Sequence, residues 1–309
     1  MKINRSHAVN ITGTAVMLFS LIFIARAFSS FDIEFSSLLS PKHALFLGIS
    51  LMAATLAVIL SALGWKMTIE FFSGNKVNSQ AAFYIYAKSN LGKYLPGKVG
   101  HYVGRQLFGA SMGMSQTQLA VASVFEVMYT VTSAVLLSFA SARNEIHSII
   151  GSLFPAANIL LILSVSIILC IFAAFLFRKN IYFKEILMLI KTKGFWGLLL
   201  KTLLIVSVNF LMGGAAFVLI VGINVPITEG STAAIFAAYV ASWLIGFLAP
   251  GVPGGIGVRE AVLTLMLSHL YPEKIILTAA VFQRLTMVGG DVTAWIISAI
   301  LRRNFGVVQ

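Results

Sequence analysis

Charged residues and cysteine are both scarce in this chain. Only 10% of its 309 residues are charged, against roughly a quarter in ordinary soluble domains. The single cysteine, Cys170, lies in an apolar segment, which excludes a disulfide framework and a thiolate metal site. No spacing of His, Asp, Glu and Cys is typical of a metal site, so neither a metal nor another cofactor is expected.

Acidic residues are the scarcer of the charged types. Ten Asp and Glu stand against 22 Lys and Arg, which gives a formal net charge of +12. In a soluble protein such an excess would suggest nucleic acid as the partner. In a membrane protein it is what cytoplasmic loops carry, and it suits anionic lipid headgroups. A membrane lipid with a phosphate headgroup is therefore the expected partner, and nucleic acid is not.

Long apolar segments fill most of the chain, of which 59% is hydrophobic. A segment of about 20 apolar residues crosses a hydrocarbon core as a helix. The first segment lacks a small-residue cleavage site and is predicted to be a retained span rather than a signal peptide. We predict an all-α polytopic membrane protein, one transmembrane domain over 1–309, with six full spans at 9–28, 45–65, 117–140, 154–177, 198–222 and 276–300.

Two further segments, 79–114 and 231–271, are interrupted by proline and glycine. The interruptions are Leu95–Gly100 and Ala249–Gly257. Proline lacks the amide N–H and glycine loosens the backbone, so neither run continues a helix. Broken backbone at membrane depth must be buried by protein or face a watery cavity. Both segments are predicted to be re-entrant hairpins with their tips inside the protein.

The distribution of Lys and Arg predicts the orientation. With the N-terminus inside, twelve Lys and Arg fall on the cytoplasmic side and four outside, leaving out those within the hairpins. This positive-inside bias predicts a multi-pass protein of the inner (plasma) membrane with both termini cytoplasmic. This orientation requires the first hairpin to enter and leave the membrane on the cytoplasmic side and the second hairpin to do so on the outer side.

The chain contains a weak internal repeat. A shift of 157 residues superimposes Pro96-Gly97 on Pro253-Gly254, and each half repeats the order span, span, broken hairpin, span. Three crossings per half would give the halves, approximately 1–150 and 151–309, opposite orientations. Inverted repeats with broken helices are typical of transporters, whose sites lie at the repeat interface. The alternative is a duplicated bundle without a transport role.

Both hairpins carry ionisable residues near their tips. Burying such charges costs several kcal/mol each unless they face water or a partner, and a lipid phosphate would suit Arg105 and Arg259. Half-helices starting near Val99 and Ile256 would add N–H donors. Alternatively, Lys88 and Lys93 snorkel to the interface. The predicted substrate-binding residues are Lys93, Pro96, Gly97, Lys98, Gly100, His101, Arg105, Pro253, Gly254, Gly255, Gly257, Arg259 and Glu260; no catalytic residue is predicted.

Three more ionisable residues lie deep in predicted spans. The repeat brings Glu126 near Arg284, so these two are predicted to form an ion pair that is either structural or part of a gate. Asp291 follows Arg284 by seven residues, on nearly the same helix face, and is a second candidate partner for it.

The two proline-glycine motifs resemble those of a known family. The run Asn90–Gly100 with Arg105 and Glu126, and the run Pro253–Ala261, are similar to motifs of the flippase-like family named for the transmembrane region of lysylphosphatidylglycerol synthase. The resemblance spans nearly the whole chain. It implies translocation of an anionic or headgroup-modified lipid, a phospholipid or a polyprenyl-phosphate-linked sugar, between leaflets. It also allows an envelope-biosynthesis enzyme as a partner.

The sequence favours a transporter over an enzyme. It contains no Walker-type nucleotide-binding run and no soluble catalytic domain after Arg303, so neither ATP hydrolysis nor aminoacyl transfer is expected. The alternative is a membrane glycosyltransferase, for which Asp32 and Glu34 would supply carboxylates, or a membrane subunit that supports a separate lipid-modifying synthase.

Overall fold

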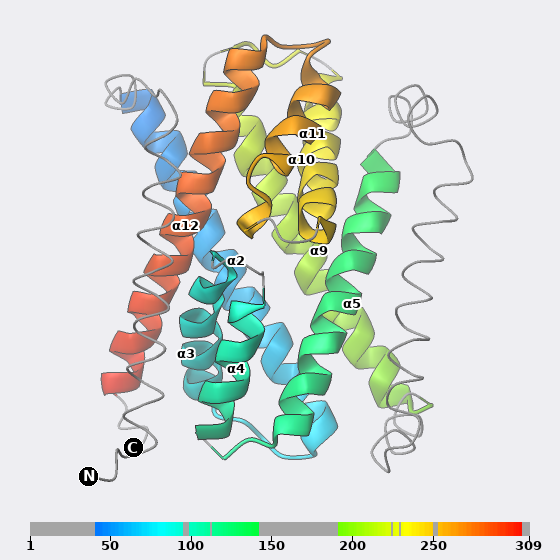
Figure 1. Cartoon of the computed structure of the whole chain (residues 1–309), viewed down its shortest axis with the longest axis vertical. Helices are drawn as coiled ribbons and strands as arrows, with labels where there is room; N and C mark the ends of the chain where they lie inside the picture. The colour runs from blue at the N-terminus through cyan, green and yellow to red at the C-terminus, as the bar shows by residue number, and fades with distance from the viewer. Residues whose placement is uncertain are drawn as a thin grey trace.

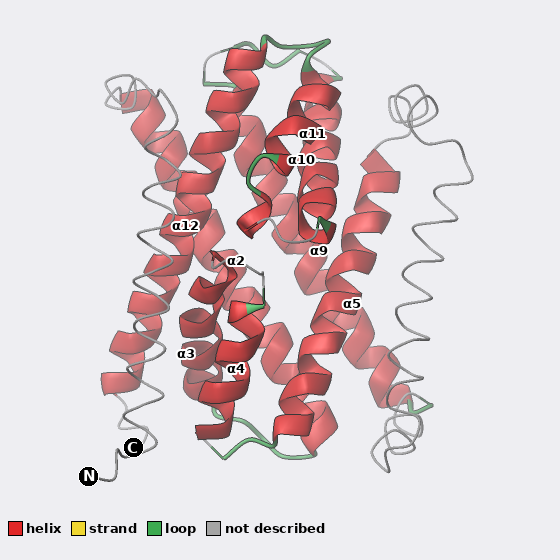
Figure 2. Ribbon diagram, viewed as in Figure 1, coloured by secondary structure: helices red, strands yellow, loops and turns green. Residues whose placement is uncertain are grey.

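The computed structural model describes residues 41–94, 99–111, 113–141, 191–223, 225–228, 230–249 and 253–304. Within these residues all regular secondary structure is helical, as Figure 2 shows. The predicted all-α class is confirmed. The predicted spans at 9–28 and 154–177, together with Cys170 and the acidic pair Asp32 and Glu34, lie outside the described residues.

Four long helices correspond to the other predicted spans. They are α2 (Pro41–Ser73), α5 (Gln116–Ser141), α9 (Lys193–Val221) and α12 (Glu273–Asn304). Among the described residues five helices are long and apolar enough to cross a membrane, these four and α10. The protein is therefore a polytopic membrane protein.

The two interrupted segments form helix–break–helix hairpins. The first consists of α3 (Ser79–Asn90), the 3-10 turn η2 (Leu91–Tyr94) and α4 (Gly100–Ser111). The second consists of α10 (Ser231–Leu248), the 3-10 turn η3 (Pro253–Gly255) and α11 (Val258–Leu267). At 1.5 Å per residue, α3, α4 and α11 are only about 15–18 Å long, too short to cross a bilayer. The fourth arm, α10, is longer and apolar enough to count as a span by itself.

The two hairpins approach each other from opposite ends of the molecule. In Figure 1, α3 and α4 occupy the lower half, α10 and α11 the upper half, and the two breaks face each other at mid-height. The turns η2 and η3 are in contact. Helix α12 runs along both hairpins and packs against α3 and α11, while α2 packs against α9 and α12. The long helices thus enclose the place where the hairpin tips meet.

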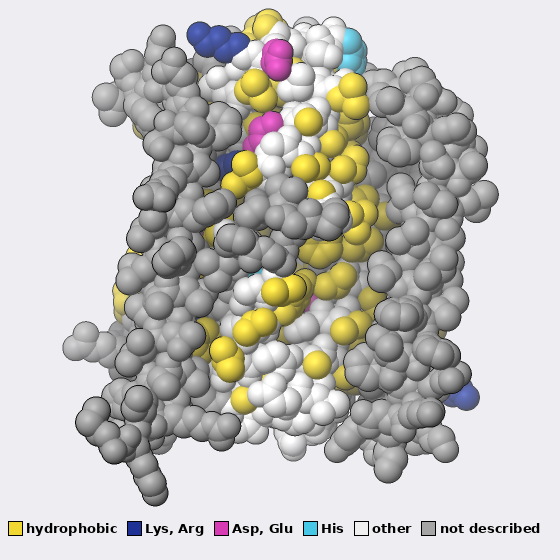
Figure 3. Space-filling view, in the orientation of Figure 1, with side chains coloured by type: hydrophobic (Ala, Val, Ile, Leu, Met, Phe, Trp, Pro, Cys, Tyr) yellow, Lys and Arg dark blue, Asp and Glu magenta, His cyan; other side chains and the backbone are white. Residues whose placement is uncertain are grey.

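Large hydrophobic side chains cover much of the outer surface. Met52 on α2 is 73% exposed, and Leu200 on α9 is 61% exposed. Figure 3 shows hydrophobic side chains over the middle of one face, with few charged ones among them. Exposed leucines and methionines of this density suit a lipid environment, because hydrocarbon solvates them without cost. Polar side chains that could bind a ligand are therefore expected in the interior of the helix bundle.

Candidate functional site

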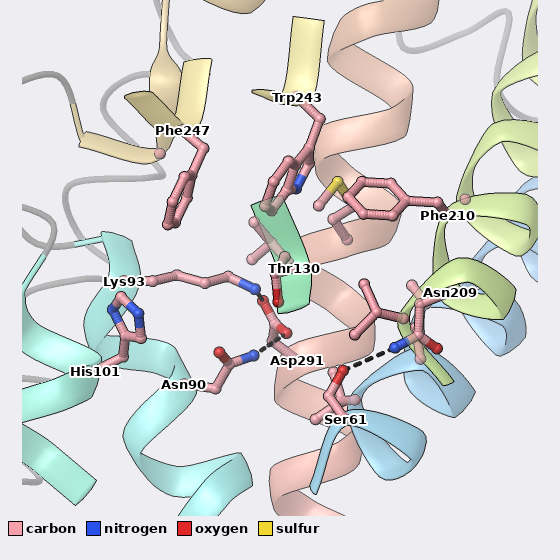
Figure 4. Close-up of a pocket in the computed structure, with 18 of the residues that line it drawn as sticks. Ser61, Asn90, Lys93, His101, Thr130, Asn209, Phe210, Trp243, Phe247 and Asp291 are labelled. Carbon is pink, nitrogen blue, oxygen red and sulfur yellow. Dashed lines mark hydrogen bonds and ion pairs between the residues drawn. The ribbon is translucent and has the colours of Figure 1, made fainter. Parts of the chain in front are cut away.

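A cavity of about 310 Å³ lies where the two hairpin tips meet. Long helices, both hairpins and both tips contribute to its wall. Figure 4 shows aromatic side chains of α10 on one side and polar side chains of the first hairpin opposite them. The labelled lining residues are Ser61, Asn90, Lys93, His101, Thr130, Asn209, Phe210, Trp243, Phe247 and Asp291.

Three glycines shape the second hairpin tip. Gly254, Gly255 and Gly257 have φ angles of 57°, 73° and 82°, a region that side chains with a Cβ atom rarely adopt. This left-handed backbone reverses the chain after Pro253 and starts α11 so that Glu260 lies in its first turn. The carboxylate of Glu260 then accepts the Gly257 N–H at 2.8 Å, which caps the helix.

Asp291 of α12 is the acceptor for the first hairpin. The Lys93 Nζ atom lies 2.6 Å from Asp291 Oδ2. Asn90 donates to Oδ1 at 2.8 Å, and the Tyr94 hydroxyl also donates to Oδ2. The Asp291 side chain is 2% exposed, whereas that of Lys93 is 28% exposed. The aspartate therefore ties the tip of the first hairpin to α12 at the edge of the cavity.

Arg105 of α4 and Glu126 of α5 form a second buried pair. The Arg105 side chain is 1% exposed, and its guanidinium contacts Glu126 Oε2. Tyr86 donates to Glu126 Oε1 at 2.7 Å, and the Arg105 guanidinium lies 4.0 Å from the centroid of the Tyr86 ring. Burial of a cation at this depth is tolerated because a carboxylate and aromatic faces surround it.

Glu260 and Arg284 form the corresponding pair in the second half. Arg284 Nε lies 2.6 Å from Glu260 Oε1, and Nη2 donates to Oε2 and to the Gly255 carbonyl oxygen, both at 3.0 Å. This guanidinium therefore holds both the tip backbone and the start of α11 against α12.

The predicted Glu126–Arg284 ion pair is wrong, and so is the alternative pairing of Arg284 with Asp291. Glu126 pairs with Arg105, Arg284 with Glu260, and Asp291 with Lys93. Each deep charge on a long helix is neutralised by a hairpin packed against that helix, and for Asp291 this hairpin belongs to the opposite half. Helix α5 packs against α4 and α12 packs against α11, so Glu126 and Arg284 each lie beside a hairpin charge.

Arg259 differs from the other arginines of the site because it forms no ion pair with any residue that the structure describes. Its side chain lies across Gly246 of α10, where an added Cβ atom would come within 2.5 Å of Arg259 Cγ. A Cβ on Gly255 would lie 3.1 Å from Arg259 Nε. The two glycines thus leave a slot for this side chain, and its guanidinium lies 5.8 Å from the centroid of the Trp243 ring.

Some of the other predicted substrate-binding residues lie at the cavity or the hairpin tips, and some lie outside the described residues. His101 lines the cavity, Gly100 begins α4, and a Cβ atom on Gly254 would lie 3.8 Å from the Tyr94 ring and 4.0 Å from Arg284. Pro96, Gly97 and Lys98 lie outside the described residues, as does the side chain of Pro253. Lys93 points toward Asp291 and does not snorkel to an interface, as Figure 4 shows.

Lys88 is the other lysine for which the sequence allowed snorkelling. It is buried at 9% exposure, and its Nζ atom lies 4.5 Å from the centroid of the Phe108 ring. Its hydrocarbon stem and ammonium are therefore covered by the hairpin itself.

Several lining residues were not predicted. Trp243 and Phe247 lie one turn apart on α10 with their rings stacked, 5.1 Å between centroids. Asn209 of α9 donates to Ser61 of α2 at 2.9 Å across the cavity wall. Aromatic spacing of four residues within an apolar helix was a signal for the first pair, because it places both rings on one face. An isolated asparagine in a predicted span was a signal for the second.

Comparison with known proteins identifies the family. A search of curated proteins finds no match. The family described as the lysylphosphatidylglycerol synthase TM region matches residues 10–293, which is most of the chain and includes both hairpins. The predicted resemblance is confirmed, and with it a membrane function related to lipids. The chain belongs to the family of the lysylphosphatidylglycerol synthase transmembrane region.

Proposed function

We propose that this protein is a flippase-like transporter that moves an anionic or headgroup-modified lipid, a phospholipid or a polyprenyl-phosphate-linked sugar, between membrane leaflets. The observation that carries the proposal is the cavity at the junction of the two hairpin tips, where charged and hydrogen-bonding side chains interrupt a largely apolar wall inside a bundle with an apolar outer surface. A headgroup in transit needs a polar interior, whereas its acyl or polyprenyl tails remain solvated by lipid. The cavity volume of about 310 Å³ lies within the range of small-ligand pockets.

The arrangement of the hairpins supports an alternating-access route. The tips approach from opposite ends of the molecule and each is held to α12 by an ion pair, Lys93–Asp291 for the first and Glu260–Arg284 for the second. In our proposal the hairpins are re-entrant and the halves 1–150 and 151–309 are inverted repeats of one transmembrane domain. Release of one tip at a time would open the cavity to one leaflet at a time.

Exchange of lipid between leaflets in proteoliposomes tests this function. The variant Ala57→Phe adds a large apolar side chain to the cavity wall without changing any charge. Leu56→Phe on the same helix is the matched control, since Leu56 is 46% exposed on the outer surface. We expect Ala57→Phe to slow exchange strongly and Leu56→Phe to exchange lipid at the parent rate.

Two results would contradict the proposal. Equal exchange rates for the two variants would mean that lipid does not pass through the cavity. A change in the mass of the lipid during incubation would identify an enzyme, in agreement with the glycosyltransferase alternative.

The proposed orientation has its own test. The loop at Asn75 and the loop at His269 lie at opposite ends of the molecule, and both residues are exposed. In a Cys170→Ser background, Asn75→Cys should be labelled only from the cytoplasm and His269→Cys only from outside, in the inner (plasma) membrane with both termini cytoplasmic. Labelling of both from one side would refute the re-entrant arrangement.

A further inference from the structure

We propose that the cavity selects lipids by headgroup charge: it binds the phosphate of an anionic, hydroxyl-bearing headgroup and rejects a net cationic, aminoacylated one. The inference rests on the proposed function, because it names the substrate class of the same cavity.

The charges at the cavity do not balance. The described cations that line it are Lys93, Arg105, Arg259 and Arg284. The carboxylates that line or adjoin it are Glu126, Asp291 and Glu260, and each of these is already paired with one of the other three cations. Arg259 is the cation in excess. A cavity in a medium of low dielectric constant with one uncompensated positive charge favours an anion.

No described carboxylate of the cavity is available to a cationic headgroup. Both oxygens of Asp291 accept hydrogen bonds from the first hairpin. Glu126 is shared between Tyr86 and Arg105, and the Glu260 carboxylate contacts Arg284 and the Gly257 N–H. An ammonium group would have to break one of these buried ion pairs and would also meet Arg259, so its entry is opposed twice.

The position of Arg259 suits a phosphate. The glycine slot of Gly246 and Gly255 fixes both its hydrocarbon stem and its Nε atom, and the buried Nε–H has no hydrogen-bond partner among the described residues. A guanidinium grips phosphate oxygens with two parallel N–H donors, so a guanidinium held in one place without a described carboxylate partner suits this ligand.

Two buried acceptors suit hydroxyl groups. Asn209 Oδ1 and Gln283 Oε1 both belong to residues that line the cavity, and neither accepts a hydrogen bond from a described residue. An unpaired buried carbonyl oxygen is costly, and a ligand hydroxyl would satisfy it. A glycerol or sugar unit attached to the phosphate offers such hydroxyls.

Equilibrium binding of radiolabelled phosphatidylglycerol to the purified full chain in neutral detergent micelles tests the inference. We expect Arg259→Gln to weaken binding about tenfold, the usual effect of losing one charge-assisted contact, and Arg259→Lys to keep most of it. Lys274→Gln is the matched control, because it removes an exposed lysine of the same half outside the cavity. Unlabelled lysyl-phosphatidylglycerol and phosphatidylcholine should compete about tenfold more weakly than unlabelled phosphatidylglycerol.

Three results would overturn the inference: equal competition by lysyl-phosphatidylglycerol, parent-like binding by a folded Arg259→Gln variant, or equal competition by soluble glycerol 3-phosphate. The last would mean that the ligand is a free phosphate ester and not a lipid. If Arg259→Gln does not fold, the headgroup selectivity of the parent still decides the question.

Leaflet exchange by the parent separates this inference from the proposed function. Equal exchange of phosphatidylglycerol and its lysyl ester would overturn charge selection and leave the transport function standing. Charge-selective binding without any exchange would support the selection and overturn transport.

Discussion

The two hairpins share a proline-glycine break but differ in how their cations are neutralised. Lys93 and Arg105 of the first hairpin each have a carboxylate on a long helix, Asp291 and Glu126. The second hairpin carries its own carboxylate, Glu260, which takes Arg284 of α12 and leaves Arg259 without an acidic partner among the described residues. Both hairpins are thus bound to long helices by ion pairs, but only the second also presents a cation without a described acidic partner to the cavity. Similar motifs in the two halves therefore serve different purposes.

Breaking the Asp291 cluster should have the largest effect on stability. Asp291→Asn leaves the Lys93 ammonium without its carboxylate and weakens two further hydrogen bonds. Loss of one member of a buried ion pair typically costs about 3–5 kcal/mol in the free energy of unfolding. Chemical denaturation in detergent measures this loss in the free energy of unfolding. Adding Lys93→Met to Asp291→Asn should restore part of it. A loss below about 1 kcal/mol would show that the cluster does not hold the hairpin.

The Arg105–Glu126 pair should have the next largest effect. Arg105→Met is expected to cost about 3 kcal/mol, because it leaves a largely buried glutamate without its cation. A double-mutant cycle on unfolding should show strong coupling of Arg105 with Glu126. The cycle of Glu126→Gln with Arg284→Gln should be additive within about 0.5 kcal/mol, since these residues have separate partners. Strong coupling of Glu126 with Arg284 would instead support the ion pair predicted from the sequence and contradict the Arg105–Glu126 pair.

The glycine slot of the second hairpin should have an intermediate effect. Gly246→Ala adds a Cβ atom only 2.5 Å from Arg259 Cγ, which is too close for two carbon atoms, so the arginine side chain must leave its slot. Such overpacking typically costs about 1–3 kcal/mol in unfolding free energy. We expect Gly246→Ala to weaken phosphatidylglycerol binding about as much as Arg259→Gln does. Gly197→Ala on α9, where a Cβ atom meets nothing within 4 Å, is the control and should leave both measurements unchanged.

Removing Arg259 itself should have the smallest effect on stability. Arg259→Gln breaks no ion pair to a described residue, so we expect the free energy of unfolding to change by less than about 1 kcal/mol. Lipid exchange should nevertheless fall strongly. The control Lys274→Gln should change neither the free energy of unfolding nor the exchange rate. A large loss of stability in Arg259→Gln would mean that both hairpins use their arginines structurally.

Much of the helical architecture followed from local sequence. The predicted span 117–140 corresponds to α5 at Gln116–Ser141, and α4 and α11 begin within two residues of the expected Val99 and Ile256. Apolar length and proline-glycine breaks are properties of short stretches of chain, so they can be read without knowing the fold. The boundaries of α2 and α9 were less accurate, because each helix continues past its apolar core into polar residues such as Lys66 and Lys193.

The sequence by itself determined that this is an all-α membrane protein with two broken hairpins and a group of cations near their tips. It could not determine which acid neutralises which cation. Asn90 and Asp291 are 201 residues apart, whereas Arg105 and Glu126 are 21 apart and Glu260 and Arg284 are 24 apart. Only the packing of hairpins against long helices brings these groups within a few ångströms, and at membrane depth that proximity fixes which charge stays unpaired. The tertiary structure therefore decided that Arg259, and not Arg105, faces the cavity without an acidic partner among the described residues.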